Sequence, residues 1–325
     1  MYSHSGTDAA LVFTEVPNGF SHWISFFIRE FEQIGPILFF MMPGIFFLSK
    51  DEDLGTLFKH RILRYVVVII LFSLFQRLYW AVASGAFNEF SLMDSLKTMY
   101  STSVIAQYWF LYAYLGMLIM FPFIRMIAKG LTKTMALYLF ALLLIFGEFF
   151  PIFEIIFDLG RINLSPEILA NIIIWPLMGY SVDHIFSDEL EKVRNRLAIY
   201  LIGGGAFLIN FVYTHRVFRA SGAFTDIGAT YTLTALAVLV FARQIAGKHE
   251  FKEGTAKILK ICGEGIFLVY LLEPQLRTAF RFVFLGLKPV ITWFPAAVIW
   301  TLIAVAFGIM LSFFLRLIPG VKKFI

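Results

Sequence analysis

Cysteine and charge are both scarce in this sequence. Cys262 is the only cysteine among 325 residues, which excludes an internal disulfide and any metal site built from several cysteines. Asp, Glu, Lys and Arg make up only 15% of the chain, whereas soluble domains carry about a quarter. The N-terminal segment also lacks the apolar run of a signal peptide. This composition argues against an ordinary soluble domain.

Apolar residues are correspondingly abundant, at 59% of the chain with a mean hydropathy of +0.80. Apolar runs near the roughly 20 residues needed to cross a bilayer recur along the whole sequence. We therefore predict an all-α, polytopic transmembrane bundle that forms a single domain over residues 1–325. A pI near 9.2 is explained by loop charge and gives no reason to invoke nucleic acid. The nine expected spans are 24–49, 63–83, 104–124, 134–151, 167–186, 197–214, 226–243, 259–280 and 293–317.

The loop charges predict an orientation for these spans. When alternate connections are assigned to alternate sides, eighteen of the 27 Lys and Arg residues fall on one side. The positive-inside rule places that side, and the C-terminus, in the cytoplasm. The N-terminus would then lie outside without a signal to carry it there. An odd span count and such an N-terminus predict that a first helix is missing from this chain.

The segment 29–64 combines an apolar run with a basic exit. Residues 34–49 contain no ionisable side chain, and Lys59, Arg61 and Arg64 follow after a polar turn. Helical spacing would put Arg61 and Arg64 on one face, where two guanidinium groups can hold a phosphate or pyrophosphate. The alternative is that these cations only fix the orientation of the span.

Four segments resemble the acyltransferase-3 family of integral membrane O-acyltransferases. PILFFMMPGIFFL followed by FKHRILR resembles its second helix and basic exit. The other three are QYWFLYAYLGMLIMFPFIR at 107–125, GIFLVYLLEP at 265–274 and LSFFLRLIPGVKKFI at 311–325. Each motif is weak alone, but their order and spacing match the family over nearly the whole chain. The resemblance implies a ten-helix architecture that here lacks most of helix 1.

The resemblance also implies an activity. Members of this family transfer an acyl group, commonly acetyl from acetyl-CoA, to a hydroxyl of a cell-surface glycan or glycolipid. By that analogy His4, in SHSG at 3–6, is the general base. Arg61, Arg64 and Lys59 would grip the phosphates of acyl-CoA, which serves as a substrate and not as a permanently bound cofactor. Arg29 would steady the acceptor or the developing oxyanion.

Three positions depart from the family pattern. Pro43 replaces the usual serine of the S-G pair. Gln107 stands where a histidine often precedes W-F-L-Y, and Tyr270 stands at the late histidine if GIFLV is aligned. Aligning the proline instead puts Glu273 there, and an ionisable group inside a span is a functional candidate in its own right. Its alternative role is a protonated glutamate bonded within the bundle. With Gln107 and Tyr270, the candidate sugar-site residues are Trp109 and Tyr112, for which an interfacial aromatic belt is the competing interpretation.

Other polar positions favour structural roles. Glu264 is expected to cap its helix or pair with Lys260, and Arg77 to snorkel at the outer end of its span. The glycines at 203–205 predict close helix packing. No histidine has a partner at metal-ligand spacing, so we expect no metal.

The sequence thus predicts a multi-pass acyltransferase of the bacterial cytoplasmic membrane. Its partners would be the lipid bilayer, a glycan or glycolipid acceptor and other polysaccharide-assembly proteins. The alternative is a non-catalytic transporter for a glycan or a lipid-linked intermediate, and the departures at Gln107 and Tyr270 favour it.

Overall fold

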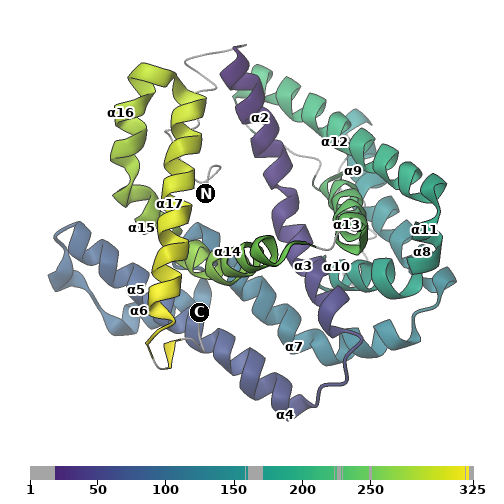
Figure 1. The fold of residues 1–325 in the computed structure, drawn as a ribbon, viewed down its shortest axis with the longest axis horizontal. Coiled ribbons are helices and arrows are strands. Elements are labelled where there is room, and N and C mark those ends of the chain that lie inside the picture. The colour runs from purple at the N-terminus through teal and green to yellow at the C-terminus, as the bar shows by residue number, and fades with distance from the viewer. Residues whose placement is uncertain are drawn as a thin grey trace. The chain divides into compact units, whose positions relative to one another are not determined.

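The structure is a computed structural model, and it describes residues 19–157, 159, 171–222, 224, 228, 230–248, 251–318 and 320–321. This part of the chain is all-helical (Figure 1). Helices satisfy their own backbone hydrogen bonds, which a lipid environment requires. The chain divides into two compact units, each assembled from separate segments.

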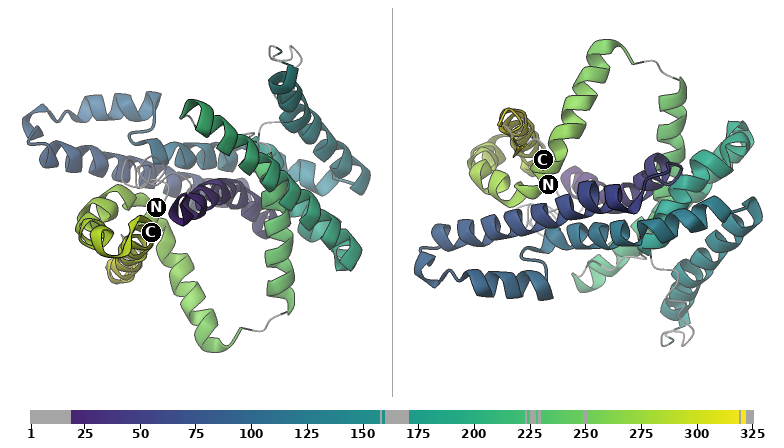
Figure 2. Two further views of the ribbon diagram at one scale, coloured as in Figure 1. Left: turned by 90° about the horizontal axis from the view of Figure 1, so that it is seen from above. Right: turned by 90° about the horizontal axis from the view of Figure 1, so that it is seen from below.

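Unit 1 consists of residues 1–30, 59–112 and 250–325. Within it, α17 packs along α14, α15 and α16, and the chain reverses after α5 so that α6 returns beside α5 (Figure 2). Val269, Leu276 and Ala304 form a small buried core where α14 and α15 meet α17. The helices of this unit include α5 (Leu63–Ala83), η3 (Phe87–Glu89), α6 (Leu92–Ser101), η4 (Ala106–Tyr108), α14 (Glu253–Leu271), α15 (Glu273–Ala279), α16 (Arg281–Ile291) and α17 (Trp293–Leu315).

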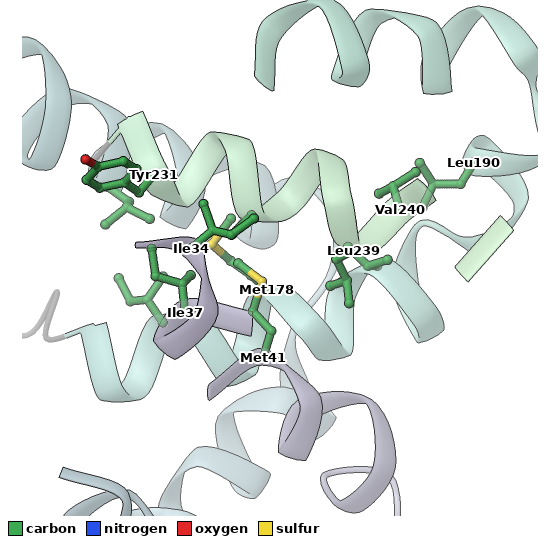
Figure 3. Close-up of a cluster of buried hydrophobic side chains, with 12 residues drawn as sticks. Ile34, Ile37, Met41, Met178, Leu190, Tyr231, Leu239 and Val240 are labelled. Atoms are coloured by element: carbon green, nitrogen blue, oxygen red, sulfur yellow. The ribbon is translucent and has the colours of Figure 1, made fainter. Parts of the chain in front are cut away.

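Unit 2 consists of residues 31–58 and 113–249. A hydrophobic core of this unit lies where α3 meets α10 and α13, with Met41, Met178 and Leu239 among the buried side chains (Figure 3). The helices of this unit are α3 (Ile34–Phe47), α4 (Leu54–Leu57), α8 (Lys133–Leu144), η5 (Ile145–Phe149), α9 (Phe150–Phe157), α10 (Asn171–Tyr180), η7 (Ser181–Ile185), α11 (Ser187–Glu191), α12 (Val193–Ser221) and α13 (Thr230–Lys248).

Among the described residues, three helices cross the boundaries between these segments. They are α2 (Phe20–Glu32), the π-helix η2 (Phe58–Ile62) and α7 (Trp109–Gly130).

Glycines bring helices of unit 2 into backbone contact. A Cβ on Gly44 of α3 would lie 1.9 Å from the carbonyl oxygen of Pro176, and one on Gly179 of α10 would lie 2.1 Å from that of Met41. Gly203 of α12 meets α13 in the same way, with Leu233 O 2.8 Å from an added Cβ. Close packing was predicted for the glycines at 203–205. It is confirmed at Gly203 and is wrong at Gly204 and Gly205, where an added Cβ would meet nothing within 4 Å.

The predicted polytopic helical architecture is confirmed. Among the described residues, five helical segments are long and apolar enough to cross a membrane: Leu54–Ala83, Ala106–Gly130, Val193–Ser221, Thr230–Gly247 and Trp293–Leu315. Each falls on one of the expected spans.

Two expected spans are broken into shorter helices. The span 24–49 contains α2 and α3 on either side of Gln33, and 259–280 contains α14 and α15 on either side of Leu272. Pro274 explains the second break, because it has no N–H to continue the hydrogen bonding of α14. One further element, α6, was not predicted, and Ser91 caps it by accepting a hydrogen bond from Asp94 N.

Candidate functional site

The basic exit lies where the π-helix η2 runs into α5. This π-helix, Phe58–Ile62, carries Lys59, His60 and Arg61, and Arg64 follows in the first turn of α5. π-Helical turns are rare and occur frequently at functional sites. Lys59 and Arg64 are exposed, whereas Arg61 is partly buried. The cations therefore cluster at one end of α5, although the two arginines differ in exposure.

A further arginine joins this end of α5 from the C-terminal helix. The charge of Arg316 acts on Arg64, so the two guanidinium groups lie near each other. Arg316 is held by Glu264 of α14: its Nη1 donates to Oε2 at 2.6 Å, and its Nη2 donates to the backbone oxygen at 2.7 Å. Among the described residues Glu264 therefore pairs with Arg316 and not with Lys260. Sequence reasoning missed Arg316 because no local motif links it to Arg64.

The turn that precedes α4 is fixed by ion pairs and a helix cap in unit 2. Asp53 caps α4 by accepting a hydrogen bond from Thr56 N at 2.9 Å, and bonds with Thr56 hold the pKa of the Asp53 carboxyl below its ordinary value. Lys129 pairs with Asp51 and lowers the pKa of that carboxyl too. Arg125 donates to the carbonyl of Glu52 at 2.9 Å. Asp51 and Asp53 are therefore ionised at neutral pH. They shortly precede the basic exit in the sequence.

A buried hydrogen-bond network links three parts of unit 1. Nε2 of Gln76 lies 3.2 Å from the Tyr108 hydroxyl, 3.1 Å from the Leu271 carbonyl and 3.1 Å from Oε1 of Gln275. In return Gln275 donates to Oε1 of Gln76 at 2.5 Å, and Tyr108 donates to the Leu271 carbonyl at 2.7 Å. The break at Leu272 leaves carbonyls of α14 without helical donors, and these side chains supply them. Polar groups inside a membrane helix bundle are functional candidates by default.

Two of the predicted site residues meet beside this network. The Tyr270 hydroxyl donates to the Gln107 carbonyl at 2.5 Å, and the Tyr270 ring lies 6.2 Å from that of Tyr108. Glu273, the first residue of α15, is only 3% exposed, and its carboxyl group lies near Tyr270. The structure thus brings Gln107, Tyr270 and Glu273 together around the α14–α15 break.

The two other aromatic candidates lie on η4–α7 with different exposure. Trp109 is half-exposed, so the interfacial-belt interpretation remains open for it. Tyr112 is partly buried, and its hydroxyl lies beside Ser73 of α5. The hydroxyls of Tyr112 and Ser73 are both buried, and neither has a hydrogen-bond partner among the described residues.

Arg29 lies on α2, where it forms an ion pair with the buried Glu30. The side chain of Arg29 is 18% exposed. His4 lies outside the described residues, so its placement near Arg29 stays a prediction. In the described part of the chain no three His, Cys, Asp or Glu residues gather as a metal site would require.

The apolar helices and their number define a multi-pass membrane protein. Residues 2–313 match the model of the acyltransferase-3 family, described as an acyltransferase domain, and the chain belongs to this family. The resemblance seen in the four sequence segments is thereby confirmed. Comparison with curated proteins and with solved structures gives no match.

Proposed function

We propose that this protein transfers an acyl group, acetyl above all, from acyl-CoA to a hydroxyl of a cell-surface polysaccharide or lipid-linked sugar. The observation that carries the proposal is the family match over residues 2–313. It is supported by a cluster of cations at one end of a membrane-spanning helix and a polar network inside the same unit.

The cationic end of α5 suits the donor. Acyl-CoA carries phosphates, and guanidinium groups bind phosphate through paired, charge-assisted hydrogen bonds. Arg61, Arg64 and Lys59 would make these contacts, and Glu264 leaves the pair with Arg316 close to neutral. The positive-inside count predicts that this end faces the cytoplasm, where acyl-CoA is found. In a bacterium the membrane would be the cytoplasmic one.

The chemical step needs a base and a site for the oxyanion. The acceptor hydroxyl attacks the thioester carbonyl, so that a C–O bond forms and the C–S bond breaks. His4 would take the proton of the hydroxyl and return it to the sulfur of departing CoA. Arg29 would stabilise the oxyanion, and Glu273 would provide a buried carboxyl group near the centre. Gln107, Trp109, Tyr112 and Tyr270 are the proposed contacts to the acceptor.

The donor assignment is tested by comparing acetyl-CoA with S-acetylpantetheine, which lacks the phosphates. Binding of both is measured by isothermal titration to the full-length chain purified in detergent. Wild-type protein should bind acetyl-CoA more tightly than S-acetylpantetheine. Arg61→Ala and Arg64→Ala should each lower the affinity for acetyl-CoA by about tenfold or more, because a hydrogen bond to a charged group contributes about 1.5–3 kcal/mol.

Binding of S-acetylpantetheine should hardly change in either variant. The matched control is Arg194→Ala, which removes an exposed arginine from the start of α12. Equal losses for both ligands, or a loss in the control as large as that in the two variants, would contradict the assignment.

A further inference from the structure

A cavity of about 380 Å³ lies at the opposite end of α5 from the basic exit, entirely within unit 1. Its walls include Arg77, Trp80 and Ser84 from the last turns of α5 and just beyond, and Glu89 from η3. The chain turns there through Gly85, whose φ of 73° suits glycine. The volume falls in the range of small-molecule sites.

The polar groups of this cavity are largely unused. Arg77 makes one hydrogen bond, a long one of 3.4 Å from its Nε to Ser95 Oγ, so its terminal nitrogens have no protein partner among the described residues. Among the same described residues, the Glu89 side chain has no hydrogen-bond or ion-pair partner either. A guanidinium and a carboxylate line one cavity without pairing to each other.

The ring of Trp80 adds an apolar wall. It is 42% exposed, and its neighbour Tyr79 meets it edge-on at 5.2 Å. An indole that is partly exposed offers a flat surface for stacking.

We propose that this cavity, lined by Arg77, Trp80 and Glu89, binds a sugar ring of the acceptor glycan. A sugar presents C–H groups that pack on an indole and hydroxyls that both donate and accept hydrogen bonds. Hydroxyls can therefore satisfy the carboxylate and the guanidinium together, because the first only accepts and the second only donates. A lipid phosphate could pair with Arg77, but Glu89 would repel it and would be left without a donor.

The position of the cavity fits the proposed function, on which this inference rests. Arg61 and Arg77 are sixteen residues apart, which is on the order of 24 Å along a helix. A donor site at one end of α5 and an acceptor site at the other would face opposite sides of the membrane. The residue before Arg77 on the same helix is Gln76, which belongs to the buried hydrogen-bond network.

Saturation-transfer difference NMR tests the cavity directly on the full-length chain in detergent. The probes are glucose, galactose and N-acetylglucosamine, with short-chain phosphatidylglycerol as the lipid probe. At least one sugar should give signals with wild-type protein. The binding of that sugar should be about tenfold weaker, or its signals should disappear, in each of the variants Trp80→Ala, Glu89→Gln and Arg77→Gln.

Tyr100→Ala is the matched control, since it removes a 95% exposed aromatic ring from α6 and should leave the sugar signals unchanged. Trp80 and Glu89 are exposed, so their variants should fold, and size-exclusion chromatography checks this. Sugar signals that are absent, or that persist in all three cavity variants, overturn the proposal. Phosphatidylglycerol binding that falls in Arg77→Gln and rises in Glu89→Gln would also overturn it and assign the cavity to a lipid headgroup.

Acetyl-CoA hydrolysis separates this inference from the proposed function. Hydrolysis that continues in the cavity variants while sugar binding is lost supports both. If the wild-type protein hydrolyses acetyl-CoA but its sugar signals are absent or persist in all three cavity variants, the proposed function is supported and the sugar site in the cavity is refuted. Specific sugar binding without any acetyl-CoA turnover would keep the cavity and remove the acyltransferase function.

Discussion

At the scale of residues, the buried amide of Gln76 is the polar group that joins α5 to η4 and to the α14–α15 break. Its own amide pairs reciprocally with that of Gln275. A membrane interior offers no water to replace a lost partner, so each member of such a network depends on the others. The network therefore fixes the relative position of the helices that carry Tyr270 and Glu273.

Gln76→Leu should lower the free energy of unfolding by about 1–3 kcal/mol, because the amide of Gln275 and the Leu271 carbonyl lose a partner inside the bundle. Unfolding in mixed detergent micelles, followed by circular dichroism, measures this cost. Gln275→Leu should be similar. The double variant should cost less than the sum of the two, since removing both amides leaves neither unpaired. Strictly additive costs would show that the two amides do not interact.

Residues that act through local sequence were easier to predict than residues that act through the fold. Arg61 and Arg64 could be recognised from their spacing, and Gln107 and Tyr270 from motifs, although their mutual hydrogen bond could not. Arg316 and Gln275 were missed because their partners, Arg64 and Gln76, lie far away in sequence. The cavity beside Arg77 could not be predicted, because Glu89 reaches it across a turn of the chain.

At the scale of elements, the breaks in the helices could be predicted less well than the helices themselves. Length and hydropathy define an apolar run but not where it bends, so they predict a single span for each of 24–49 and 259–280, where the structure has two helices. The proline in the second run coincides with the break. The amphipathic α6 was missed because its ten residues are too short and too polar to resemble a span.

The contact between α3 and α10 gives a prediction at this scale. Gly44→Ala or Gly179→Ala would place a methyl group about 2 Å from a backbone carbonyl oxygen, which no side-chain movement can relieve. Each should lower the free energy of unfolding by about 3 kcal/mol or more and reduce the yield of folded protein. Thermal unfolding in detergent measures it.

Gly204→Ala provides the control for these two variants. It lies within α12, and an added Cβ there meets nothing within 4 Å. Alanine should therefore stabilise the helix by about 0.5–1 kcal/mol through its higher helix propensity. A Gly204→Ala cost equal to that of Gly44→Ala would contradict the close-contact explanation.

The cap of α4 predicts a dependence on pH. The hydrogen bonds from Thr56 lower the pKa of Asp53 in the folded state. Their stabilisation is therefore present above the unfolded pKa of about 3.9 and is lost as pH falls through the lower, folded value. Asp53→Asn keeps an acceptor at this position but cannot titrate.

The melting temperatures of the two proteins, compared from about pH 6 to about pH 3, test this cap. The wild type should lose its advantage over Asp53→Asn at the acid end of the range. A constant difference across the range would exclude a role for the ionised carboxylate.

At the scale of the whole molecule, the chain has the properties of a protein solvated by lipid. Many large apolar side chains are exposed, among them Phe39, Phe123 and Leu302. They need a bilayer or detergent, because an aqueous surface rarely presents so much contiguous apolar area. Hydropathy predicted this class from the sequence, since it sums over every residue and needs no knowledge of contacts. The single-domain assignment over residues 1–325 stays a prediction.

The central claim is that this protein moves an acyl group from CoA to a glycan, and the most direct test follows the acyl group itself. Purified full-length protein in detergent is given acetyl-CoA labelled in the acetyl group, with a crude extract of lipid-linked glycans as acceptor. We predict that the label appears in the glycan fraction together with free CoA, and that Arg64→Ala greatly reduces both while Arg194→Ala does not. Release of neither labelled glycan nor CoA, from protein that still translocates a glycan across vesicles, would contradict the account and identify a transporter.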